Sequence, residues 1–68
     1  MQRESILEKI EADIYTEKVK RGRNLKKREV EAIISNFGTI NQETQKLTTT
    51  DGNYDISLSE IVGWQQAE

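Results

Sequence analysis

The chain of 68 residues contains no cysteine, no histidine and no proline. Without cysteine there is no disulfide framework and no thiolate zinc site. Without histidine there is no Ser–His–Asp triad and no imidazole metal ligand. The four glycines are scattered, so the chain has no glycine-rich phosphate loop. We therefore expect a protein that is not an enzyme, has no metal site and uses no cofactor, and we expect it in the reducing cytoplasm.

Large apolar side chains are also few. Sixteen residues are Ile, Leu, Val or Phe, a share modestly above the roughly 20% below which disorder is the better expectation. No apolar run is long enough to span a bilayer or to act as a secretion signal, so no membrane partner is expected. The length fits one small domain over residues 1–68 with a thin core. Marginal stability or homodimerisation is the expectation for such a core.

The first part of the chain has helical periodicity. Apolar residues at spacings of three and four predict an amphipathic helix over about 4–21, with acidic residues towards its start and basic residues towards its end. Gly22 follows the last basic residue and suits a left-handed cap. The buried stripe of this helix is expected to contain Ile6, Leu7, Ile10, Ile14, Tyr15 and Val19.

A second helix is predicted over about 25–37, with Asn24 as its N-cap and Gly38 as its end. The short connection between the two helices is typical of a helical hairpin. A single long helix through Gly22 is the alternative, since one glycine costs only about 1 kcal/mol in a helix. The expected buried face of the second helix consists of Val30, Ile33, Ile34 and Phe37.

Residues 39–47 fit two structures. Thr39 and Gln42 match a capping box, and a sparse apolar line follows, as in a short helix. The same polar composition is typical of a loop. Both alternatives stay open at this point.

The last third of the chain contains a hairpin signal and a helix signal. Three threonines favour extended backbone, and Asp51-Gly52 indicates a two-residue turn between strands at about 47–50 and 53–56. A capping box from Ser57 to Glu60 then predicts a short C-terminal helix, with Trp64 docked on the core. Together these segments predict an α+β fold.

The charges are strongly segregated, although the net charge is only −2. Residues 18–28 contain seven of the ten basic residues and no acidic residue, so this window carries +7 and the rest of the chain −9. Like charges at this density repel one another, which favours an exposed corner that meets phosphates or an acidic partner. The other interpretation is a solvated corner balanced by nearby glutamates. The basic residues are Lys18, Lys20, Arg21, Arg23, Lys26, Lys27 and Arg28.

A helical segment at residues 39–47 would complete a helix-turn-helix of the kind that binds DNA. Its exposed amides and ammonium group suit hydrogen bonds to base edges, because Asn and Gln pair with adenine and Lys with guanine. The hairpin would then form a small wing. The candidate base-contacting residues are Asn41, Gln42, Gln45 and Lys46.

These patterns favour a small nucleic-acid-binding accessory or regulatory protein, of a kind found in bacteria and phages. Its basic corner between two helices would contact phosphates, and DNA is expected ahead of RNA. The main alternative is an adaptor or inhibitor that docks its basic corner on an acidic protein surface. A third hypothesis is a small structural subunit of a larger, phage-like assembly, in which a dipolar surface favours head-to-tail contact.

Overall fold

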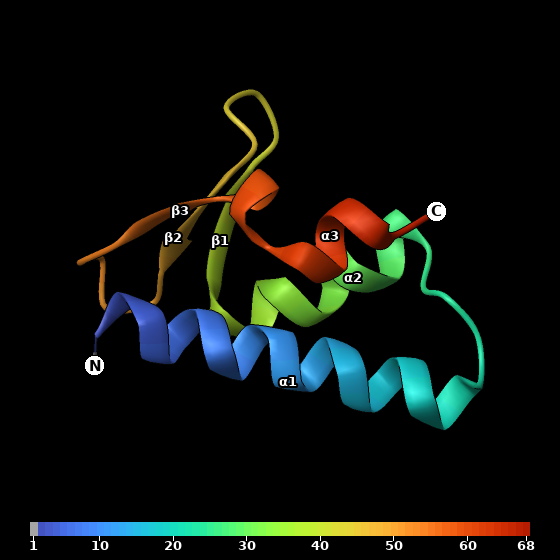
Figure 1. Ribbon diagram of the computed structural model, residues 1–68. Helices are drawn as coiled ribbons and strands as arrows, with labels where there is room; N and C mark the ends of the chain where they lie inside the picture. Colours follow the sequence, from blue (N-terminus) through green and yellow to red (C-terminus); the bar gives the residue numbers. More distant parts are fainter. Residues whose placement is uncertain (1) are drawn as a thin grey trace.

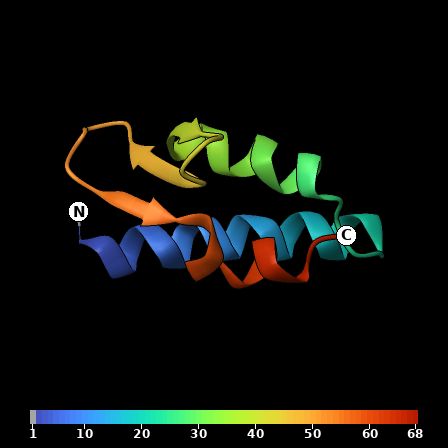
Figure 2. The same cartoon turned by 90° about the horizontal axis from the view of Figure 1, so that it is seen from above.

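The computed structural model describes residues 2–68, and it confirms the α+β class (Figure 1). Three helices surround a core that a three-stranded antiparallel sheet closes at one end. Figure 2 shows the long first helix running along the whole molecule, with the sheet near its N-terminal half. The elements in chain order are α1 (Arg3–Arg21), α2 (Lys27–Ile34), η1 (Ser35–Phe37), β1 (Gly38–Asn41), β2 (Lys46–Thr49), β3 (Asp55–Ser57), η2 (Leu58–Glu60) and α3 (Val62–Gln66).

Helix α1 is the element that the sequence predicted best. It ends at Gly22, which adopts φ 69° and donates its N–H to the Lys18 carbonyl at 2.9 Å, as expected of a left-handed cap. Its buried residues lie on one stripe. The extension of that stripe to Tyr15 and Val19 is wrong, because these side chains are 68% and 60% exposed. The buried positions of α1 are Ile6, Ile10 and Ile14.

Helix α2 is shorter than the predicted segment, and η1 completes it as a 3-10 turn. Its N-cap is Lys26, so the prediction of Asn24 as the cap is wrong. The reason is Leu25, which is only 3% exposed and lies among the core residues. Burying this side chain delays the start of the helix by two residues. The single long helix through Gly22 is also excluded, since residues 22–26 are not helical.

Residues 39–47 are neither a helix nor a loop. They form β1, a turn and the start of β2, so the predicted capping box at Thr39 is wrong. The strands pair with Ile40 opposite Leu47, which in turn lies opposite Ile56 of β3. This cross-strand apolar row packs against the helices. The sparse apolar line of residues 39–47 therefore belongs to paired strands and not to a helix.

Gly38 begins β1 for a steric reason. A Cβ atom at this position would lie 2.0 Å from the Thr48 carbonyl oxygen of β2. The absence of a side chain therefore lets the two strands approach each other. At the other end of β1, the Asn41 Oδ1 accepts the N–H groups of Glu43 and Thr44 at 2.9 and 3.2 Å, which stabilises the turn.

The predicted hairpin at Asp51-Gly52 is confirmed, but its loop spans residues 50–54 instead of two. The Thr49 N–H donates to the Tyr54 carbonyl at 2.9 Å across the loop. Asp51 accepts hydrogen bonds from the Thr49 hydroxyl at 2.6 Å and the Asn53 N–H at 3.0 Å. These donors lower the pKa of Asp51 and hold the wider loop closed.

The C-terminal helix is confirmed and begins later than its capping box. The Ser57 N–H donates to the Glu60 carboxylate at 3.1 Å, and this box closes the single turn η2. Helix α3 follows after Ile61 and is held on α1 by Glu11. The Glu11 carboxylate accepts the N–H groups of Val62 and Gly63 at 2.7 and 3.0 Å, which satisfies two of the free amides at the start of α3.

One continuous core joins all these elements. Trp64 of α3 packs against it as expected, half-buried. The buried side chains come from α1, the connection before α2, α2 itself, strands β2 and β3 and the C-terminal segment. They are Ile6, Ile10, Ile14, Leu25, Val30, Ile34, Leu47, Ile56, Leu58 and Ile61.

Candidate nucleic-acid interface

The seven basic residues of the 18–28 window lie at one end of the molecule, opposite the sheet (Figure 1). They belong to the last turn of α1, the connection to α2 and the first turn of α2, and we call this region the basic corner. Two features shape it. Gly22 reverses the chain, and Leu25 anchors the connection in the core. The C-terminal residue adds a third support, because the Glu68 N–H donates to the Leu25 carbonyl and its own carbonyl accepts the Lys27 N–H, each at 2.9 Å.

One carboxylate organises the two arginines of the connection. Glu29 accepts hydrogen bonds from Arg23 at 2.9 and 3.0 Å and from Arg21 at 2.7 Å. Arg21 also pairs with Glu17 at 2.7 Å, four residues earlier on α1. Hydrogen bonds from Arg23 and from the Lys26 N–H lower the pKa of Glu29 to about 2, and the pKa of Arg23 is raised. The two guanidinium groups are therefore held in place and partly neutralised.

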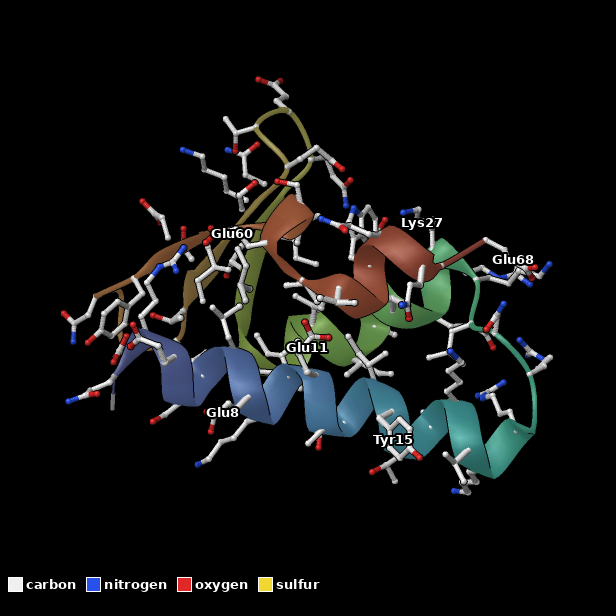
Figure 3. The ribbon with its side chains drawn as sticks, in the orientation of Figure 1. Glu8, Glu11, Tyr15, Lys27, Glu60 and Glu68 are labelled. Carbon is white, nitrogen blue, oxygen red and sulfur yellow. The ribbon has the colours of Figure 1, made fainter. Side chains whose placement is uncertain are left out.

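Two lysines of the corner contact the C-terminal segment instead. The Lys26 ammonium lies 3.7 Å from the Glu68 carboxylate. The Lys27 ammonium donates to the Trp64 carbonyl and lies 4.3 Å from the centre of the Trp64 ring, a cation–π geometry. Figure 3 shows Lys27 close to α3 and Glu68 at the same end of the molecule. These contacts give both lysines a structural role.

Apart from Lys27, which contacts Trp64, three cations of the corner have no carboxylate partner in the described part of the chain. Among residues 2–68, no acidic group lies within ion-pair distance of Lys18, Lys20 or Arg28. Lys20 and Arg28 are exposed, and Lys18 is half-buried. The nearby glutamates that the solvated-corner interpretation invokes thus pair with Arg21 and Arg23 and not with these three cations.

The predicted recognition helix is wrong, because its four candidate residues lie in the β1–β2 hairpin. Asn41 ends β1, Lys46 begins β2, and Gln42 and Gln45 belong to the turn between them, where Gln45 has φ 55°. The Gln45 amide donates to the Gln42 carbonyl at 2.8 Å, within the turn itself. A turn of this kind does not present a row of side chains to a groove, as the first turns of a recognition helix do.

The structure nevertheless brings one of these residues near the basic corner. Gln42 and Arg28 line the same open hollow, between α2 and the free edge of β1. The Gln42 amide donates to the Glu31 carboxylate of α2 at 3.0 Å, which ties the turn to the helix. Gln42, one of the four predicted base contacts, therefore shares a surface with Arg28, a predicted phosphate contact.

Tyr15 is a surface residue that the sequence analysis assigned to the core. It lines a shallow hollow together with Lys18, Val19 and Arg23, beside the basic corner. The helical periodicity of the sequence indicates this exposed position. Each residue of a helix turns by about 100°, so Tyr15 lies well away from the stripe that ends at Ile14.

Comparison with known proteins gives no relative: no family model, no curated protein and no solved structure matches the chain significantly. In the part of the chain that the structure describes, no helix is both long and apolar enough to cross a membrane. Within residues 2–68, no three carboxylates lie together in a group that would hold a metal ion.

Proposed function

We propose that this protein binds the phosphate backbone of nucleic acids through its basic corner, as a small accessory or regulatory protein. The observation that carries the proposal is the set of three cations with neither a carboxylate nor an aromatic partner within residues 2–68, Lys18, Lys20 and Arg28, at the end of the molecule where most of the positive charge lies. Each such cation releases condensed counterions when it meets a phosphate, and this release is the main source of sequence-independent affinity.

The ion pairs around Glu29 support the proposal in a second way. They hold Arg21 and Arg23 in a fixed position without using all ten of their N–H donors. A phosphate that approaches the corner therefore meets arginines whose side chains are already ordered. Ordering a long side chain on binding costs about 0.5–1.5 kcal/mol, so part of that cost is met when the chain folds.

The acidic remainder of the molecule favours one orientation on a polyanion. Outside the 18–28 window the chain carries −9 against the +7 of the window. A phosphate backbone attracts the basic corner and repels the opposite end, which steers the encounter. Since the predicted recognition segment at residues 39–47 forms strands and a turn, the proposed contacts are to phosphates, and we expect little discrimination between base sequences.

An adaptor or inhibitor that docks on an acidic protein is the second candidate function. The observation in its favour is the pair of exposed apolar side chains, Tyr15 and Val19, beside Lys18. Large apolar side chains anchor protein interfaces, whereas backbone phosphates do not need them. The two candidates differ in their response to truncation of Tyr15, which should leave phosphate binding unchanged and weaken an adaptor.

Fluorescence anisotropy with a labelled DNA duplex and a labelled single-stranded RNA, each across a salt series, tests the proposal. Three phosphate contacts on duplex DNA should give a slope of log K against log salt of about −3, since each contributes roughly −0.9. A slope near zero, or no binding at low salt, would contradict the proposal.

Lys20 and Lys9 provide a matched pair of variants. Both are exposed lysines of α1 without an ion pair, and only Lys20 belongs to the basic corner. Lys20→Gln should reduce the slope by roughly one unit, while Lys9→Gln removes the same charge and should leave it unchanged. Equal effects of both substitutions would show that nucleic-acid binding depends on net charge alone and not on the basic corner.

A further inference from the structure

One face of α1 is turned away from the rest of the molecule. Its residues follow helical spacings of three and four, and all are exposed. Figure 3 shows Glu8 and Tyr15 on this side, whereas Glu11 points towards α3. We call this surface the outer face of α1, and it consists of Glu4, Glu8, Ala12, Tyr15 and Val19.

The intramolecular packing of the chain does not account for the apolar part of this face. The core takes Ile6, Ile10 and Ile14 from the opposite side of α1. Tyr15 and Val19 are left 68% and 60% exposed, one helical turn apart. Valine is also a poorer helix former than the charged residues that normally occupy a solvated face. The two side chains form a small exposed apolar patch, and contiguous apolar patches are the surfaces at which partners dock.

The charges beside these residues are arranged so that the face complements a second copy of itself. Glu4 and Glu8 lie at its N-terminal end, and Lys18 and Arg23 line the same hollow as Tyr15 and Val19. When two copies of α1 run antiparallel, the acidic end of each lies on the basic end of the other. The apolar residues then meet in the middle.

We propose that two copies of this chain associate through the outer face of α1, antiparallel and across a two-fold axis. The charge order argues for a second copy, because an isologous interface needs a patch that is complementary to its own reversed image. A nucleic acid would be repelled by the acidic half of the face. An unrelated acidic protein would meet only its basic half.

The register follows from matching large residues to small ones. With the axis between residues 13 and 14, Tyr15 of one copy lies opposite Ala12 of the other. The same register places Val19 opposite Glu8, whose long stem can pack on it while the carboxylate reaches Lys18. Glu4 then lies opposite the C-terminal end of α1, where Arg23 lines the hollow beside Tyr15. Every contact occurs twice because of the two-fold symmetry.

This proposal does not depend on the proposed function. Lys20 and Arg28 are not part of the outer face of α1 or of the hollow beside it. A dimer would therefore keep two copies of Lys20 and of Arg28 free for phosphates, whereas Lys18 would pair with Glu8 of the second copy. The association is also measured without nucleic acid, so failure of one proposal leaves the other standing.

Sedimentation equilibrium at protein concentrations up to about 1 mM tests the association, since even an interface worth only about −4 kcal/mol is then half-populated. We expect a monomer–dimer equilibrium. Val19→Ser should raise the dissociation constant at least about tenfold. Val62→Ser is the matched control on α3, where the valine is 52% exposed, and it should leave the constant unchanged. A monomer at every concentration, or equal effects of the two substitutions, would overturn the proposal.

A charge exchange tests which residues meet. Glu8→Lys and Lys18→Glu should each weaken the dimer, because each creates two symmetric repulsions in the homodimer. The double variant Glu8→Lys/Lys18→Glu should restore it. If the double variant is as weak as the singles, Glu8 and Lys18 do not face each other and the register is wrong. Circular dichroism of each variant checks that the exposed substitutions leave the fold intact.

Single introduced thiols test the orientation, since the chain has no cysteine of its own. Ala12→Cys lies close to the proposed axis and should form a disulfide with the second copy under mild oxidation. Glu4→Cys lies at the far end of the face, and in the antiparallel dimer its two thiols are separated by more than a disulfide can span. Efficient cross-linking of Glu4→Cys would indicate a parallel pair and overturn the proposal.

Discussion

Gly63→Ala is a substitution for which helix propensity and packing predict opposite results. Gly63 lies in α3, where alanine is the better helix former by about 1 kcal/mol. The added Cβ, however, would lie 2.6 Å from the Cγ2 and 2.9 Å from the Cδ1 of Ile14. Ile14 is buried and branched next to its backbone, so it has little freedom to move away.

Overpacking of this kind costs about 1–3 kcal/mol. After the gain in helix propensity, we expect Gly63→Ala to lower the free energy of unfolding by about 1 kcal/mol. For a domain of this size that corresponds to a fall in Tm of about 4–8 °C. Urea and thermal unfolding, followed by circular dichroism and by the fluorescence of Trp64, measure the effect. A rise in stability would refute the close packing of α3 on α1.

A double-mutant cycle separates the clash from other effects. Ile14→Ala alone should cost about 2–5 kcal/mol, because it leaves a cavity in the core. It also removes the two nearest carbons that the new methyl group would meet, and of the three close atoms only the Cβ of residue 14, at 3.2 Å, remains. Adding Gly63→Ala to Ile14→Ala should therefore cause no further loss of stability. An equal loss in both backgrounds would show that the two residues are not in contact.

Three further predictions concern contacts that hold the corner and α3. The pKa of Glu29 is lowered from 4.5 to about 2 by Arg23 and by the Lys26 N–H, so its pairing stabilises the fold fully above pH 4.5 and is lost as the pH falls towards 2. Glu29→Gln should flatten this part of the pH dependence of urea unfolding, and an unchanged profile would contradict the pairing. Glu11→Ala should destabilise by about 0.5–2 kcal/mol through loss of the α3 cap, and an effect confined to below 0.2 kcal/mol would show that the cap is unimportant. Lys27→Met should shift the emission of Trp64 and cost about 0.5–1 kcal/mol, whereas identical spectra would place the ammonium away from the ring.

Local signals in the sequence are sufficient to predict α1 and the hairpin between β2 and β3. The buried positions of α1 recur at helical spacing and end at a glycine, and Asp51-Gly52 has the chemistry of a turn. Strand β1 could not be found in this way. It has four residues, one of them the apolar Ile40, and its pairing depends on Leu47 and on a glycine that permits close approach. Such evidence exists only once the chain has folded.

The candidate site likewise has one feature that the sequence predicts and one that it does not. The density of basic residues is visible in the sequence, and their common location follows from the short connection between two helices. Their pairing is not visible, because Glu29 reaches Arg21 and Arg23 only through the turn that Leu25 anchors. Tyr15 was misplaced because it adjoins the buried stripe in sequence. One residue of helical rotation moves its side chain from the core to the surface.

The most direct test of phosphate binding by the basic corner is an NMR titration of the isotope-labelled protein with a short DNA duplex. Amide shifts that change with added duplex should concentrate in residues 18–28 and diminish as salt is raised. The β1–β2 turn at residues 42–45 and the sheet should be almost unaffected. Shifts centred on that turn, or a spectrum that does not respond to duplex at low salt, would contradict the proposal that the corner binds nucleic acid.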